Sequence, residues 1–287
     1  MTQTLTDDYG EAEVFDFAAT EDVSFDEFKI NLSRKPKTFI PLVSFGKSVV
    51  MSRCGISAIT GKAKSRKSTL VTLLCQKYLT ESNGKILIVD TEMAEFYVHR
   101  NAKRLHNMMG WNENVDNERF VNLQFRGLAT DKRFDMFSKA IKHFKPDLIF
   151  LDGVRDLLKD FNKIDEVVHV VDELMKLSED YKCHICCILH ENKGDTNMRG
   201  HLGTEIQNKA ETVIGITNSG ESSQADPRYT RNIPFQPFDF TINKNGIPEF
   251  LQFGMIGQKF EYEQTTFDTH ISPNKNFETQ KDDTVPF

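Results

Sequence analysis

The chain has 287 residues, which is enough for one large α/β domain or two small ones, and 39% of them are hydrophobic. Its net charge of −6 at pH 7 excludes nucleic-acid binding through overall basic charge, so any such contact must come from local basic loops. No apolar run is long enough to span a membrane, and the five cysteines show no regular spacing. We therefore expect a cytoplasmic protein without a membrane partner.

The first segment, residues 1–35, is acidic and carries phenylalanines between its charged residues. Such a segment is either disordered or packs as an arm on the folded core or on a neighbouring subunit. The rest of the chain predicts a folded domain over residues 36–255, and then a polar, flexible, acidic tail over residues 256–287.

Apolar runs alternate with helical patterns from about residue 50 onward. The predicted strands are 56–60, 86–90, 120–124, 148–152, 184–190 and 212–217, and the predicted helices are 67–80, 94–108, 130–143, 164–180 and 203–209. This alternation predicts an α/β fold with a mostly parallel sheet and helices on both faces. After residue 225, two or three strands with turn signals such as Asn245-Gly246 predict an antiparallel C-terminal extension.

The segment between the first of these strands and its helix is typical of a phosphate-binding P-loop. Strand, tight loop and helix N-terminus together direct backbone N–H groups at the phosphates of a nucleotide. Lys67 would contact the β- and γ-phosphates, and the Ser68 hydroxyl would bind Mg²⁺. The predicted nucleotide-binding residues are Gly61, Lys62, Ala63, Lys64, Ser65, Arg66, Lys67, Ser68 and Thr69.

One residue departs from the usual pattern G-x-x-x-x-G-K-[ST]. Gly61 stands at the first glycine position, but Arg66 stands at the second. Glycine is common there because the loop bends sharply and the backbone approaches phosphate closely. Arg66 either tolerates the bend at some strain or adds a cation beside the phosphates.

Acidic residues follow two of the predicted strands. Asp90 and Glu92 follow strand 86–90, where a carboxylate either orients the water that attacks the γ-phosphate or caps the next helix. Strand 148–152 ends in Asp152, about 85 residues after Lys67, which is the Walker B pattern in which the carboxylate holds Mg²⁺ through water. Because the carboxyl ends of parallel strands share one edge of the sheet, these acids are expected to lie beside the P-loop.

Two further groups are candidates for sensing phosphate. His190 ends strand 184–190, where a polar side chain lies near the γ-phosphate, although a lone histidine is more often an ordinary surface or core group. Arg228 and Arg231 lie in the extension. An arginine there either stabilises γ-phosphate charge in a neighbouring subunit or is a solvated charge on an edge strand.

These segments together resemble the RecA-type P-loop ATPase superfamily, and within it the RepA-like branch of hexameric helicase-type ATPases found on plasmids and mobile elements. The resemblance covers roughly residues 40–250 and rests on the P-loop and on the motifs after the strands. Those motifs are Val89-Asp90-Thr91-Glu92 with Arg100 downstream, Leu151-Asp152-Gly153-Val154-Arg155-Asp156, His190-Glu191-Asn192-Lys193, Arg199-Gly200-His201-Leu202-Gly203, and Arg231-Asn232-Ile233-Pro234-Phe235 through Asn245-Gly246-Ile247-Pro248.

The resemblance implies a role for each of these motifs. It implies Glu92 as the catalytic carboxylate, Asp152 as the Walker B acid and His190 as the γ-phosphate sensor, with ATP and Mg²⁺ as ligands. It also implies a ring of identical subunits, possibly a hexamer, with ATP between subunits and single-stranded DNA along the axis. DNA would be held by loops 153–163 and 193–205, and the candidate contacts there are Arg155, Lys159, Lys193 and Arg199. The alternative is that these charges are solvated loop residues.

The last residues resemble the acidic tip of bacterial single-stranded-DNA-binding proteins, with an aspartate run followed by Pro-Phe and the carboxylate. A pocket could take the Phe287 ring after Pro286, while basic groups take the carboxylate and the side chains of Asp282 and Asp283. Proteins that bind such tips are therefore predicted partners. The sequence as a whole predicts an ATPase of DNA replication or mobilisation that moves or remodels DNA. The alternative is a nucleotide-dependent scaffold that recruits DNA-processing proteins with little motor activity.

Overall fold

The computed structural model describes residues 26, 29–33, 39–160, 163–192 and 194–251. The chain divides into two compact units, Met1–Thr38 and Phe39–Phe287. In the first unit, the Asn31 side-chain oxygen accepts hydrogen bonds from the Ser33 amide and hydroxyl, at 3.0 and 2.6 Å, and closes a short turn. The predicted arm 1–35 and tail 256–287 lie almost wholly outside the described residues.

The second unit is built on a nine-stranded sheet. Its strands, from one edge to the other, are β11 (Pro248–Phe250), β10 (Phe238–Ile242), β9 (Ser222–Thr230), β8 (Thr212–Asn218), β3 (Ile56–Gly61), β7 (His184–His190), β6 (Leu148–Asp152), β4 (Ile86–Asp90) and β5 (Phe120–Gln124). All neighbours from β8 to β5 are parallel, whereas β9, β10 and β11 are each antiparallel to the strand before. The predicted RecA-like α/β fold with an antiparallel extension is therefore confirmed.

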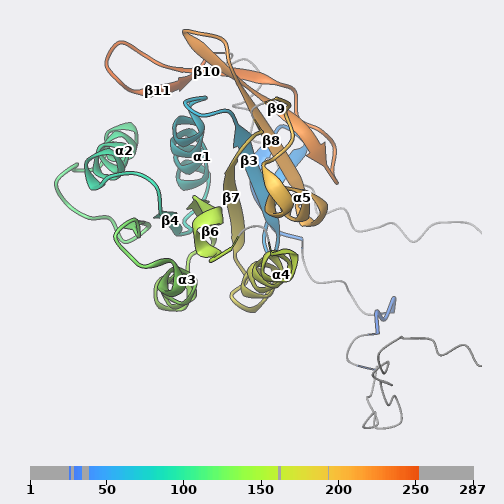
Figure 1. Ribbon diagram of the computed structural model, residues 1–287. Coiled ribbons are helices and arrows are strands. Elements are labelled where there is room, and N and C mark those ends of the chain that lie inside the picture. The colour runs from blue at the N-terminus through green and yellow to red at the C-terminus, as the bar shows by residue number, and fades with distance from the viewer. Residues whose placement is uncertain (1–25, 27–28, 34–38, 161–162, 193, 252–287) are drawn as a thin grey trace, which may run out of the picture. The chain divides into compact units, whose positions relative to one another are not determined.

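Helices cover both faces of this sheet, as Figure 1 shows. The helices are α1 (Lys67–Glu81), α2 (Glu95–Met108), α3 (Thr130–Phe144), α4 (Ile164–Asp180) and α5 (Gly200–Lys209), with a short 3-10 helix η3 (Val154–Leu157) after β6. One core lies under α3, α4 and α5, and the other lies under α1 and α2. The parallel strands are buried on both faces because apolar residues alternate between the two cores, as Ala58 and Ile59 do in β3.

The predicted strands and helices agree with the observed ones to within a few residues at each end. The largest difference is in α5, which begins at Gly200 rather than at residue 203. The hairpin of β1 (Pro41–Phe45) and β2 (Ser48–Ser52) was not predicted. Its two-residue turn contains Gly46 at φ 59°, and its side chains Val43 and Met51 join the core around α1. No helix of the described ranges is long and apolar enough to cross a membrane.

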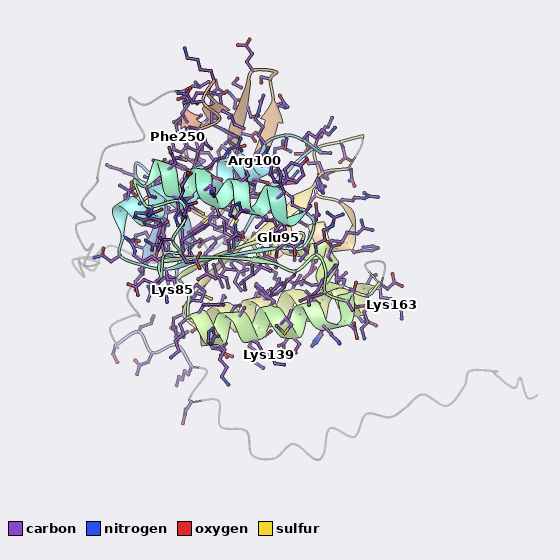
Figure 2. All side chains as sticks on the ribbon, turned by 90° about the vertical axis from the view of Figure 1, so that its left-hand side faces the viewer. Lys85, Glu95, Arg100, Lys139, Lys163 and Phe250 are labelled. Carbon is purple, nitrogen blue, oxygen red and sulfur yellow. The ribbon has the colours of Figure 1, made fainter. Side chains whose placement is uncertain are left out.

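The strand register determines which residues meet at the carboxyl edge of the sheet. Asp90 is paired with Asp152 between β4 and β6, and Gly61 is paired with His190 between β3 and β7. In Figure 2, Lys85, just before β4, and Lys163, just before α4, lie on opposite sides of the second unit and mark the amino and carboxyl ends of the parallel strands. The ends of four strands that are distant in sequence therefore converge on one edge.

A buried polar cluster lies at the amino ends of the parallel strands, around His184, which is fully buried. Its Nδ1–H donates to the Ser52 carbonyl at 2.7 Å, because a carbonyl can only accept, and its Nε2 accepts from the Ser57 hydroxyl at 2.7 Å. The Glu211 carboxylate lies 3.6 Å from Nδ1 and accepts from the Ser52 amide and hydroxyl. Burial lowers the pKa of His184 to about 4, and burial raises the pKa of Glu211.

We expect this histidine to make the protein less stable in mild acid. A histidine that is harder to protonate in the folded chain contributes its full stability above its unfolded pKa of 6.5, and loses it as the pH falls toward about 4. At about 1.4 kcal/mol per pH unit, the loss reaches up to about 3 kcal/mol. Urea unfolding at pH 7, 5.5 and 4.5 measures it. His184→Gln is the control, because it retains hydrogen-bonding groups, does not titrate and keeps Glu211. Parallel pH profiles for the two proteins would contradict the assignment.

Candidate functional site

The P-loop connects the end of β3 to the start of α1. Lys67 is the first residue of α1, so the amides of Lys67 and Ser68 have no partner within the helix and are available to an anion. A Cβ at Gly61 would lie 2.5 Å from Ser65 Oγ and 2.9 Å from the Ile216 carbonyl oxygen. Only glycine fits at that position, as the first glycine of the motif predicts.

Arg66 occupies the sharp bend just before α1. Its φ of 69° and ψ of 33° are left-handed, which is the conformation that the second glycine of the motif normally adopts. Its guanidinium donates to the Ser222 carbonyl oxygen at 2.7 Å and to Ser223 Oγ at 3.0 Å, both in the strand after β8. Of the two interpretations, the structure supports the strained bend, because the guanidinium is bound to this neighbouring hairpin and is not a free cation beside the phosphates.

The P-loop lysine is linked to the predicted catalytic carboxylate through His190. The buried Lys67 ammonium donates to the Gly61 and Lys62 carbonyl oxygens at 3.0 and 3.1 Å and to His190 Nδ1 at 3.1 Å. Because Nδ1 accepts, the proton of the neutral ring lies on Nε2, which faces Glu92 Oε2 at 3.4 Å. The hydrogen bond from His190 lowers the pKa of Glu92, and burial lowers the pKa of Lys67 against the opposing effect of nearby carboxylates.

Asp152 forms the acidic part of the site. Ser68 Oγ lies 3.5 Å from Asp152 Oδ2, so the two predicted Mg²⁺ ligands are adjacent. Burial, together with the charges of Asp90 and Glu92, raises the pKa of Asp152 to about 7. Asp90, Glu92 and Asp152 lie close together, and the charge of Lys67 offsets only part of their negative charge. Such a site favours a bound cation.

Asp90 holds the turn that presents Glu92. Its Oδ1 accepts from the amides of Glu92 at 2.9 Å and Met93 at 2.7 Å. Helix α2 begins at Glu95 after Ala94, and no side chain caps it. The interpretation of Asp90 or Glu92 as a helix cap is therefore wrong. Asp90 has a local structural role, and Glu92 is left with its side chain toward His190.

Two of the predicted DNA contacts lie beside this site. Arg155 and Arg199 line the same hollow as Glu92 and His190, and the charge of Arg155 contributes to the lowered pKa of Glu92. Arg199 precedes α5, and its amide donates to the His190 carbonyl oxygen at 3.0 Å, so the loop after β7 returns to its own strand end. The two arginines that were predicted from separate loops are thus near each other and near the predicted catalytic residues.

The remaining predicted residues lie elsewhere. Lys159 is exposed in the loop after η3, and Lys193 lies outside the described residues. Arg231 donates to the Asn208 and Lys209 carbonyl oxygens at the C-terminus of α5, at 3.2 and 3.3 Å. Its amide also bonds the carbonyl of Glu211, just before β8, so Arg231 lies at the sheet edge opposite the P-loop and does not join this site within one chain.

Arg100, part of the motif after β4, also does not reach the site. Its guanidinium lies over the Tyr97 ring, 5.0 Å from the ring centre, on the exposed surface of α2 (Figure 2).

Several residues that shape the site were not predicted from the sequence. Asn218 and Ser223 contact the P-loop from more than 150 residues away, and nothing local in the sequence indicates it. The hydroxyl of Thr91, directly after β4, lies 2.9 Å from Asp156 Oδ2 in the loop after β6. Arg133 Nη1 approaches the same carboxylate oxygen to 3.7 Å. These contacts fix the loop that carries Arg155.

The site has the features that a nucleotide with Mg²⁺ requires. Ser65 Oγ is buried in the P-loop without a hydrogen-bond partner. The described residues hold no cluster of three or more His, Cys, Asp or Glu that could bind a metal alone. A hydroxyl and one carboxylate are nevertheless what Mg²⁺ commonly takes from a protein when phosphate oxygens and waters complete its octahedron. Ser68 and Asp152 would hold the ion.

Comparison with known proteins agrees with this geometry. The model of a family described as an AAA domain matches residues 44–196, just over half of the chain, and the match includes the P-loop, Glu92, Asp152 and His190. No curated protein matches the chain. The matched residues include both the P-loop and the acidic residues beside it. The chain therefore belongs to the AAA-domain family of P-loop ATPases.

Proposed function

We propose that this protein hydrolyses ATP with Mg²⁺ and uses the reaction to move or remodel single-stranded DNA during replication or mobilisation. The observation that carries the hydrolysis proposal is the hydrogen-bonded series Lys67–His190–Glu92 beside Ser68 and Asp152. It supports a site in which Lys67 would bind phosphate, His190 would sense it, Glu92 would accept a proton, and Ser68 and Asp152 would bind the metal.

Each residue has a distinct chemical task in this proposal. Lys67 binds the β- and γ-phosphate oxygens, for which it must leave some of its present acceptors. Glu92 is ionised at neutral pH, since its pKa is lowered, and it orients a water and accepts its proton. His190 lies between the two and would respond when γ-phosphate contacts are lost. Mg²⁺, when bound, neutralises phosphate charge.

The DNA part of the proposal rests on the resemblance to RepA-like ATPases and on the position of two arginines. Arg155 and Arg199 are exposed and line the hollow beside Glu92. A phosphate backbone bound by these side chains would change the electrostatic environment of Glu92, because Arg155 already lowers its pKa. DNA binding and hydrolysis would in this way be energetically coupled.

We also propose that the protein assembles as a ring in which a neighbour completes each site. Within one chain, Arg231 lies at the amino ends of the parallel strands, opposite the P-loop. Its guanidinium could therefore act only on a neighbouring subunit's nucleotide. The proposed partner-binding tip, Asp282, Asp283, Pro286 and Phe287, lies outside the described residues and stays a prediction.

Single-stranded DNA should raise the ATPase rate by about tenfold, the size of an ordinary coupling between two sites. The rate is measured with and without DNA, and the mass of the assembly is determined with ATP present. The variant Arg155→Ala should weaken DNA binding. It should also make the negative slope of log affinity against log salt concentration shallower by about 0.7, since one phosphate contact is lost. Arg199→Ala should behave in the same way.

Lys139→Ala is the matched control, because this exposed lysine lies on α3 and pairs with Asp135 away from the hollow. It should keep the wild-type salt slope. ATP binding and hydrolysis without any response to DNA would overturn the DNA-remodelling proposal. That result would favour the nucleotide-dependent scaffold, which binds ATP and recruits other proteins with little motor activity.

A further inference from the structure

We propose that the turn between β8 and β9 is a brace that fixes the phosphate-binding conformation of the P-loop, and that Arg66 is the positioning residue that joins the two. The brace goes beyond the proposed function but rests on its nucleotide site. The brace consists of residues 218–223 of the hairpin, and Arg66 is the loop residue whose side chain it binds.

The Arg66 guanidinium is surrounded by acceptors from this turn. Nη1 donates to the Ser222 carbonyl oxygen at 2.7 Å and to Ser223 Oγ at 3.0 Å, and it lies 3.4 Å from Asn218 Oδ1. Nη2 donates to the Gly220 carbonyl oxygen at 2.5 Å. A planar guanidinium with several fixed donors suits such a set of carbonyls, and an ammonium group could not reach all of them.

The turn also bonds the backbone of the two preceding loop residues. Asn218 Nδ2 donates to the Lys64 carbonyl oxygen at 3.2 Å, and Ser223 Oγ donates to the Ser65 carbonyl oxygen at 3.2 Å. Lys64, Ser65 and Arg66 are therefore each held by the same short turn. Ser223 is fully buried, so its bond to the loop is shielded from competing water.

The loop requires such support because of its backbone conformation. Lys64 and Arg66 have φ values of 63° and 69°, in the left-handed region that residues with a side chain rarely adopt. Such a conformation persists only where the surroundings fix it. A glycine at position 66 would adopt the left-handed bend without strain. Arg66 adopts the same bend, and the turn stabilises it by binding the guanidinium.

The brace is itself fixed to the rest of the extension. Within the turn, the Gly220 amide donates to Asn218 Oδ1 at 2.8 Å, and the Ser219 amide donates to the Ser222 carbonyl oxygen at 3.0 Å. Thr241 in β10 donates to the Glu221 carbonyl oxygen at 2.7 Å. The P-loop conformation therefore depends on the antiparallel strands, which makes the extension part of the nucleotide site.

The test removes the two hairpin side chains that bond the loop backbone, and it leaves Arg66 in place with its bonds to the Ser222 and Gly220 carbonyl oxygens. In the full-length chain, the double variant Asn218→Ala/Ser223→Ala should bind Mg·ADP about tenfold more weakly and raise the KM for ATP similarly, while kcat changes less than twofold. Arg66→Ala should weaken binding as much, because alanine at position 66 keeps the left-handed bend and makes none of the contacts of the guanidinium. Combining all three changes should weaken binding further, because Arg66 keeps its bonds to the Ser222 and Gly220 carbonyl oxygens in the double variant.

The adjacent Gln224→Ala is the matched control. Its side chain points to the other face of β9 and bonds Asp239, so both ADP affinity and KM should stay at wild-type values. If Arg66 instead acted on the phosphates, the double variant, which keeps Arg66, would bind Mg·ADP as tightly as the wild type. That result, or wild-type affinity in Arg66→Ala, overturns the brace.

A measurement without nucleotide separates this inference from the proposed function. Amide hydrogen exchange of the segment 62–66 should be about tenfold faster in Asn218→Ala/Ser223→Ala than in the wild type, and unchanged in Gln224→Ala. Equal exchange in the double variant and the wild type overturns the brace. Failure of the wild type to bind ADP would remove the proposed function, whereas the exchange result would still decide whether the turn holds the loop.

Discussion

Replacing Glu92 by glutamine should leave ATP binding intact and slow hydrolysis by on the order of a hundredfold or more, the usual loss when general-base help is removed. Glu92 faces His190 Nε2 at 3.4 Å, and its pKa is lowered by that contact and by the nearby cations Lys67 and Arg155. Its carboxylate is therefore ionised and able to accept a proton at neutral pH. Glutamine has the same shape and can still accept a hydrogen bond from His190, but it cannot take a proton from water.

Single-turnover hydrolysis, measured beside the ATP dissociation constant, distinguishes the two effects. Glu95→Gln is the matched control, because Glu95 is the first residue of α2 and takes no part in the Lys67–His190–Glu92 series. It should hydrolyse ATP at the wild-type rate. An unchanged rate in Glu92→Gln would show that Glu92 is only a structural residue of the turn after β4.

The sheet and its helices could be predicted from the sequence because local patterns determine them. The parallel strands other than β8 are each followed by a helix, and β6 with α4 shows the pattern of a short apolar run before a helix with one apolar face. The carboxyl edge was predictable for the same reason, since parallel strands bring their ends together whatever their order. The positions of Glu92, Asp152 and His190 at this edge follow from it, and the position of Lys67 and Ser68 at the start of α1 follows from the motif, while their roles stay predictions.

The contacts between strand ends and the extension could not be predicted. Whether Arg66 turns toward a phosphate or toward a hairpin depends on where β9 lies, and the chain from β3 to β9 runs through most of the fold. Asp90 looked like a candidate for catalysis or capping, yet only the observed turn shows its side chain bonded to amides two and three residues ahead. The polar cluster of His184 could not be predicted because its partners Ser52, Ser57 and Glu211 are distant from it in the sequence.

Replacing Lys67 by alanine should abolish tight ATP binding, with a loss of at least about a hundredfold. A charge-assisted hydrogen bond to phosphate contributes up to about 3 kcal/mol, and the loss of a buried partner adds to it. The Lys67 ammonium lies between the Gly61 and Lys62 carbonyl oxygens and His190, at the start of α1, where a nucleotide's phosphates would meet the helix N-terminus. No other lysine of the described loop is buried there, because Lys62 and Lys64 are exposed.

Lys67→Ala is measured by equilibrium titration with Mg·ATP, after circular dichroism and thermal unfolding have shown that the variant is folded. Lys132→Ala is the control for loss of one positive charge, because this lysine is exposed on α3, far along the chain from the loop. It should bind ATP as the wild type does. Wild-type affinity in Lys67→Ala would mean that phosphate does not bind at the end of β3. The resemblance of the sheet to other P-loop ATPases would then describe the fold alone, because the residue that gives the loop its affinity for phosphate would have no such role here.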